Sequence, residues 1–80
     1  MSKFDLYLEQ AKDNPAGLSR KQLIRVQNIA MEKGLEIGWR GGLGLMNNDS
    51  EDFPEVSILS IQSMLEFAYK AGLEDGKKSV

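Results

Sequence analysis

A nine-residue pattern that occurs twice constrains the fold of this chain more than any other feature of its sequence. Residues 30–38 read AMEKGLEIG and residues 68–76 read AYKAGLEDG, so five of the nine positions are identical. Both copies continue an apolar pattern of helical period, which places small residues four apart along a helix. A glycine inside a helix costs about 1 kcal/mol relative to alanine. Such a row must therefore be compensated by close packing, or it must end the helix.

The first interpretation is that the small residues let a second helix approach closely. Residues four apart form a ridge on a helix, and two such ridges pack at a crossing angle of about −50°. Glu36 and Ile37 continue the helical pattern beyond Gly34, which favours this interpretation. The residues predicted to form a self-association contact are Ala30, Gly34, Gly38, Trp39 and Gly42.

The alternative interpretation is that each copy of the pattern stops a helix. In a Schellman cap, a glycine in the left-handed conformation follows the helix, and the next apolar residue folds back over the last turn. Gly34 with Leu35, and Gly72 with Leu73, fit that spacing. The sequence leaves open whether Gly34 and Gly72 cap their helices or lie inside them.

Capping and turn signals divide the chain into three helices. Ser2 and Ser19 each begin a capping-box spacing, which is typical of a helix start. Pro54 suits the first turn of a third helix, where its missing N–H does no harm. No segment alternates apolar and polar residues as a half-buried strand does. The predicted fold is a single all-α domain over residues 1–80, with helices at about 3–12, 19–41 and 54–76.

The lengths of the last two helices suggest that the protein is an oligomer. A helix over residues 19–41 would be roughly 35 Å long, which is long for an 80-residue chain. Residues Ile58, Ile61 and Leu65 begin an apolar stripe of the kind found at helix seams. An antiparallel hairpin of these helices would leave apolar surface uncovered. We therefore expect a homodimer or higher homo-oligomer with a bundle-like core; the alternative is a compact three-helix monomer.

Composition and motifs exclude several kinds of chemistry. The chain has neither cysteine nor histidine, which excludes disulfides, thiolate or imidazole catalysis and Cys/His zinc sites. Residues 47–52 lack the glycine and the final glutamate of an EF-hand loop. Residues 41–44 lack the pattern of a phosphate-binding loop. We expect no enzyme activity, no cofactor and no metal. Without a membrane-length apolar run or a signal segment, the protein is expected to be cytoplasmic.

Two clusters of opposite charge are the candidate partner-binding sites. Residues 46–66 contain five acidic residues and no basic residue, although the net charge of the chain is only −2. Basic residues gather at the start of the second predicted helix, where they oppose the helix dipole. Helix stability therefore does not explain them. The residues predicted to bind a partner are Arg20, Lys21, Arg25, Arg40, Asp49, Glu51, Asp52 and Glu55.

Residues 18–40 resemble a helix-turn-helix segment in one respect, the A-x-x-x-G spacing of Ala30 and Gly34. That resemblance implies a DNA-binding dimer that uses the basic cluster. The next helix would have to hold three glycines, however, and would be a poor rigid reader of the major groove. The acidic net charge also works against the phosphate attraction that drives DNA affinity. A nucleic-acid partner is therefore the less favoured alternative.

The first alternative, ranked ahead of DNA binding, is a ligand-binding oligomer with its site at the subunit interface. Trp39 and Arg40 at a subunit boundary could stack a planar, nucleotide-like molecule. The favoured function is a non-enzymatic, homo-oligomeric interaction protein that acts as a stoichiometric inhibitor or adaptor of a partner macromolecule, expected to be a protein. Small proteins of this kind are common among phage and mobile-element accessory genes, an analogy of size and class alone.

Overall fold

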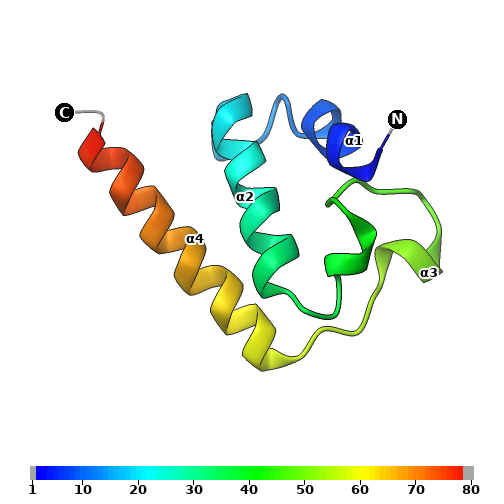
Figure 1. The fold of residues 1–80 in the computed structure, drawn as a ribbon. Coiled ribbons are helices and arrows are strands. Elements are labelled where there is room, and N and C mark those ends of the chain that lie inside the picture. The colour runs from blue at the N-terminus through cyan, green and yellow to red at the C-terminus, as the bar shows by residue number, and fades with distance from the viewer. Residues whose placement is uncertain (1, 79–80) are drawn as a thin grey trace.

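The structure, a computed structural model, describes residues 2–78 and contains no strand among them. In chain order the elements are α1 (Lys3–Gln10), α2 (Arg20–Lys33), the 3₁₀ turn η1 (Gly38–Arg40), the single-turn helix α3 (Asp49–Asp52) and α4 (Ile58–Lys78). Figure 1 shows α2 and α4 running in opposite directions and diverging toward the C-terminus, with α1, η1 and α3 on the other side of α2. The predicted all-α class is confirmed, as is the contact between the second and third main helices.

Serine caps begin the first two main helices, as the sequence predicts. The Ser2 hydroxyl accepts a hydrogen bond from the Asp5 N–H at 3.1 Å. The Ser19 hydroxyl accepts one from the Gln22 N–H at 3.2 Å, and the Gln22 side chain accepts the Ser19 N–H at 2.8 Å. These bonds satisfy N–H groups that have no partner within the helix. The first helix ends at Gln10, slightly before the predicted end at residue 12.

The prediction of a helix over residues 19–41 is wrong, because α2 ends at Lys33. Gly34 follows the helix with φ −86° and ψ 79°, while its N–H still donates to the Ala30 carbonyl at 2.8 Å. Those dihedral angles are not left-handed, so this end is not a Schellman cap either. The chain then turns, and the Ile37 N–H donates to the Gly34 carbonyl at 2.9 Å. The predicted row of small residues therefore does not lie on one helix.

The second copy of the nine-residue pattern lies inside a continuous helix. Gly72 and Gly76 are interior residues of α4. A Cβ atom added to either glycine would meet no atom within 4 Å. Gly72 therefore neither ends its helix nor packs closely against another part of the described chain. The two copies have different conformations, and the pattern is not a structural repeat.

The third main helix begins at Ile58, later than the predicted start at residue 54. The Ser57 hydroxyl accepts the Ser60 N–H at 3.1 Å, so Ser57 acts as the cap. Pro54 lies in the link that precedes the helix. Within the acidic stretch of residues 46–66, Asp49–Asp52 form the single turn α3, and the Asn48 side chain caps that turn.

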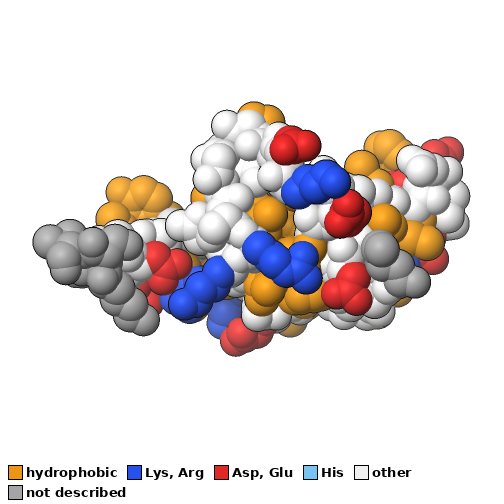
Figure 2. Space-filling view, turned by 90° about the horizontal axis from the view of Figure 1, so that it is seen from above, with side chains coloured by type: hydrophobic (Ala, Val, Ile, Leu, Met, Phe, Trp, Pro, Cys, Tyr) orange, Lys and Arg blue, Asp and Glu red, His pale blue; other side chains and the backbone are white. Residues whose placement is uncertain are grey.

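The apolar core is small, and the molecule is thin. The buried apolar side chains are Leu8, Leu23, Ala30, Ile37 and Ala71. The principal extents are 42 × 28 × 18 Å. The radius of gyration is 12.9 Å, compared with about 11.6 Å for a compact domain of this length. Figure 2 shows hydrophobic side chains reaching the surface between charged ones. The chain therefore leaves more apolar surface open than a compact fold would.

Candidate interaction surfaces

Much of the apolar surface of α4 faces solvent. Ile58, Ile61 and Leu65, which begin the predicted stripe, are all exposed. The described residues of α4 that are buried, Ser60 and Ala71, lie on a neighbouring face of the helix. The stripe is therefore present, but α2 does not cover it.

A groove lies between the first half of α2 and the last half of α4, where the two helices diverge (Figure 1). Its volume is about 360 Å³. Small residues of α4 form one wall, and apolar residues of α2 and of the preceding loop form the other. The residues that line it include Leu18, Val26, Ile29, Ala68, Gly72 and Gly76. The glycines leave part of the α4 wall without side chains. Gln22, Arg25 and Asp75 make up the polar part of the lining.

Polar contacts hold α2 and α4 together beside this groove. The Arg25 guanidinium lies 3.3 Å from the Glu74 carboxylate and 3.7 Å from that of Asp75. Nearer the end of α2, the Lys33 ammonium lies 4.1 Å from the centre of the Phe67 ring, a cation–π contact. Arg25, predicted to bind a partner, therefore also serves the fold of the chain itself.

The predicted self-association glycines lie against other parts of the same chain. A Cβ atom on Gly34 would meet the Met64 sulfur of α4 at 2.8 Å, and one on Gly38 would meet the Met31 carbonyl at 2.9 Å. A Cβ atom on Gly42 would collide with the backbone of α1. Other parts of the described chain therefore do approach these glycines closely, but the contacts lie within one copy of the protein and not between two copies. Ala30 belongs to the buried core.

Gln27 is a buried polar residue that sequence reasoning did not single out. It is fully buried. Its side chain donates to the Phe4 carbonyl at 3.0 Å and accepts the Leu43 N–H at 3.0 Å. One side chain of α2 therefore binds both α1 and the loop that follows η1. The sequence signal is that Gln27 interrupts an apolar face, four residues after Leu23 and three before Ala30.

Arg40 and Asp52, both predicted to bind a partner, hold the loop between them. The Arg40 guanidinium donates to the carbonyls of Gly42 at 2.8 Å and Gly44 at 2.9 Å, and lies 3.5 Å from Asp52. The Asp52 carboxylate accepts the N–H groups of Met46 and Asn47, each at 2.8 Å. The Met46 hydrogen bond is the main reason that the pKa of Asp52 is lowered, with smaller contributions from other backbone N–H groups and the Arg40 charge. A partner would have to compete with these bonds.

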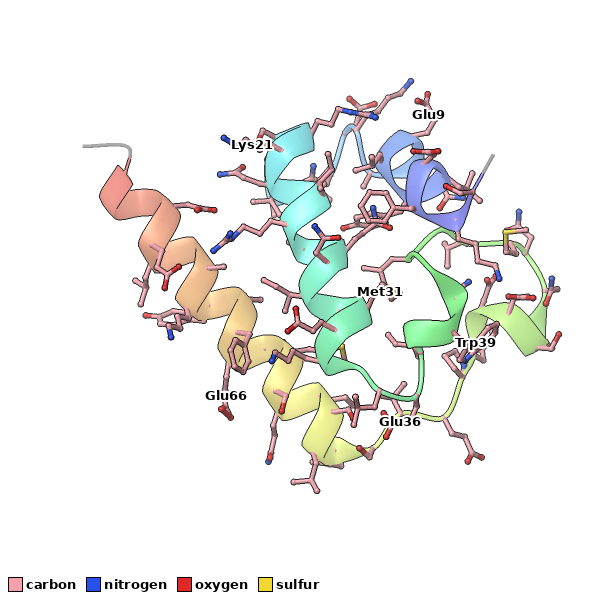
Figure 3. All side chains as sticks on the ribbon, viewed as in Figure 1. Glu9, Lys21, Met31, Glu36, Trp39 and Glu66 are labelled. Carbon is pink, nitrogen blue, oxygen red and sulfur yellow. The ribbon has the colours of Figure 1, made fainter. Side chains whose placement is uncertain are left out.

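Glu36 lies in the turn after α2, near the serines at the start of α4. Its carboxylate has a lowered pKa, chiefly because of a hydrogen bond from the Ser60 hydroxyl and also because of bonds from its own backbone and from Ser57. An anion at this position is also favoured by the dipole of α4. Figure 3 shows Glu36 on the turn below α2, close to the first residues of α4.

We expect the chain to unfold more easily in urea as the pH falls from about 5 to about 3. Asp52 and Glu36 release their protons more readily in the folded chain than in the unfolded one. Their stabilisation is complete above the unfolded pKa values, about 3.9 and 4.3, and is lost as the pH falls through them toward the lower folded values. The urea midpoint at each pH measures the effect. The combined variant Asp52→Asn and Glu36→Gln should show a shallower dependence, and an unchanged slope would contradict the assignment.

Trp39 lies at the surface next to α1. The indole is 62% exposed, and its N–H donates to the Glu36 carbonyl at 2.9 Å. The Lys3 ammonium lies 5.1 Å from the ring centre and 2.7 Å from the Glu51 carboxylate. Arg40 is not a free ligand group beside Trp39, because its guanidinium donates to the Gly42 and Gly44 carbonyls.

The remaining predicted partner-binding residues are not brought together. Arg20 and Lys21 are exposed at the start of α2, and Asp49 and Glu55 are exposed on and after α3. The segment that would serve as a recognition helix is the single turn η1. Among residues 2–78, no group of three or more acidic side chains is placed to hold a metal ion. No described helix has the length and apolar character needed to cross a membrane.

Comparison with known proteins places the chain in a family. A model of the family of unknown function DUF6900 matches residues 21–76, and the chain therefore belongs to that family. The matched region spans α2 to α4. It contains both the exposed apolar stripe that begins at Ile58 and the α4 wall of the groove. No curated protein and no solved structure matches the chain.

Proposed function

We propose that this DUF6900 member is a non-enzymatic interaction protein that self-associates through α4 and acts as a stoichiometric inhibitor or adaptor of a partner macromolecule. The observation that carries the proposal is the exposed apolar face of α4. Leu65 is 66% exposed, and Ile58, Tyr69 and Leu73 are exposed along the same helix. Contiguous apolar surface of this kind on a small protein is typical of a protein interface.

The accessible surface area supports self-association. The chain exposes 5805 Å², whereas a compact monomer of 8.9 kDa is expected to expose about 4800 Å². The excess is comparable to the roughly 800 Å² that each partner buries in a standard interface. A second copy on α4 would bring the exposed area per chain to that of an ordinary globular protein.

The other candidate functions have less support. A nucleotide-like ligand would need the Arg40 guanidinium, which is bound to two backbone carbonyls and faces Asp52. A DNA-binding dimer would need a recognition helix directly after Gly34, and residues 35–48 form no helix longer than the single turn η1. A partner protein remains the expected target, with Trp39, Asp49 and Glu55 exposed to solvent.

A pair of leucine substitutions on α4 tests self-association. Leu65→Glu would place a carboxylate in the interface of each copy, without a partner, and should weaken dimerisation by about 100-fold or more. Leu59→Glu is the matched control, because Leu59 is 75% exposed on the same helix but lies about 120° round the helix axis from Leu65. Light scattering after size exclusion measures the molar mass of both. If Leu65→Glu dimerised as well as Leu59→Glu, the α4 contact would be wrong.

A further inference from the structure

We infer that α4 pairs antiparallel with α4 of a second copy, so that Ile61 and Leu65 of each chain enter the groove of the other. The inference rests on the proposed self-association and specifies its geometry. The first half of α4 carries the large apolar side chains of Ile61 and Leu65. The second half carries Gly72 and Gly76, which line the groove that would receive those side chains.

The two halves lie on one face of α4. Successive residues of a helix are rotated by about 100°. On that basis Ile61 and Leu65 in the first half fall within about 80° of Ala68, Gly72 and Gly76 in the second half. The small residues form a wall of the 360 Å³ groove. A Cβ atom on Gly72 or Gly76 would meet nothing within 4 Å, so the space in front of them is vacant.

In an antiparallel pair of α4 helices, one register sets the large residues of each copy opposite the glycines of the other. If Leu65 lies opposite Gly72 of the second copy, Ile61 lies opposite its Gly76, because both pairs have the same midpoint between residues 68 and 69. A two-fold axis at that midpoint repeats each contact, as a closed dimer requires. Parallel pairing would instead set large residues against large ones and leave both grooves open.

The positions of the charged residues on α4 also favour this face as the contact between two copies. The face formed by residues 58, 61, 65, 68, 69, 72 and 76 contains no charged residue. The charged residues Glu66, Lys70 and Glu74 lie about 105° or more from its centre. Asp75 lies at its edge, about 70° from the centre, and is paired with Arg25. Figure 3 shows Glu66 directed away from α2 and from the groove. A second α4 would therefore bury no charge from this face, and in the groove it would meet Arg25 and Asp75, whose charges are already paired with each other at 3.7 Å.

Engineered cysteines test the direction and register. The chain has no native cysteine, so each single variant reports one position. In the inferred dimer the two copies of residue 69 are offset by only about 1.5 Å along the helix axis, whereas the two copies of residue 58 are roughly 30 Å apart. Tyr69→Cys should therefore form an intermolecular disulfide under mild oxidation, and Ile58→Cys should not, given the short Cα separation that a disulfide needs.

The outcomes of the cysteine experiment separate the two proposals. Equal cross-linking of Tyr69→Cys and Ile58→Cys in a dimeric protein would indicate parallel pairing, which would overturn the inferred geometry and leave self-association standing. A dimeric Tyr69→Cys variant that fails to cross-link would also overturn the register. A monomeric wild-type chain would overturn the proposed function itself.

A glycine substitution tests whether the vacant groove receives the partner. Gly72→Leu should fold, because the site is open and helical, and circular dichroism would show helix content at least as high as in the wild type. The new side chain should fill the space needed by Leu65 of the second copy and weaken dimerisation by about tenfold or more. Glu66→Leu, on the charged row, is the matched control. Wild-type dimerisation of Gly72→Leu would overturn the inference.

Discussion

Gln27→Met is expected to lower the free energy of unfolding by roughly 2–4 kcal/mol, because it removes one hydrogen bond to the Phe4 carbonyl and leaves the part-buried Leu43 N–H without a partner, which alone costs about 1–3 kcal/mol. Methionine has a similar length and keeps the buried apolar contacts. It cannot donate to the Phe4 carbonyl or accept the Leu43 N–H, the two bonds that Gln27 makes at 3.0 Å. Urea denaturation followed by circular dichroism measures the change.

The size of the Gln27 effect is meaningful against the stability of a domain of this length, which is roughly 4–12 kcal/mol. Gln62→Met is the control, because Gln62 is exposed on α4, and its change should stay within about 0.5 kcal/mol. If Gln27→Met were as stable as Gln62→Met, Gln27 would not be what holds α1 and the loop after η1 to α2.

Gly42→Ala is expected to cost about 3 kcal/mol or more, at the upper end of the range for overpacking. The added Cβ atom would collide with the backbone of Lys3 and Phe4 at the start of α1. Backbone atoms cannot move aside as a flexible side chain can, so α1 would have to shift away from the loop. The neighbouring hydrogen bond from the Gly44 N–H to the Lys3 carbonyl, at 3.0 Å, would be lost with it.

Gly17→Ala separates this steric effect from the ordinary cost of replacing a glycine. Gly17 has a φ of +69° and open space around it, so alanine there meets backbone strain of about 1–2 kcal/mol without a collision. The urea midpoint should fall further for Gly42→Ala than for Gly17→Ala. The reverse order would show that α1 does not pack closely on the loop.

Capping motifs in the sequence predicted the starts of the first two helices well, because a cap bonds to residues in the same helical turn. The side chains of Ser2 and Ser19 bond within their own first turns, and both helix starts were confirmed. The end of α2 depends on distant residues. Gly34 ends the helix where Met64 of α4 approaches, and Glu36 binds the serines at the start of α4. No pattern within residues 30–38 contains that information, since the same pattern at residues 68–76 is a continuous helix.

The candidate site was predictable only in part. The apolar stripe that begins at Ile58 was visible in the sequence, but its exposure was not, because exposure depends on which face of α4 the helix α2 covers. Arg40 and Asp52 look like surface charges in the sequence, and the loop geometry brings them together at 3.5 Å. The groove depends on the divergence of two helices, which no local pattern specifies.

Molar mass in solution tests the central claim most directly. Sedimentation equilibrium of the wild-type chain over a range of concentrations should give a mass that rises toward twice the 8.9 kDa of a single chain. The same measurement on Leu65→Glu should give the single-chain mass throughout. A wild-type mass of 8.9 kDa at every concentration would contradict self-association through α4.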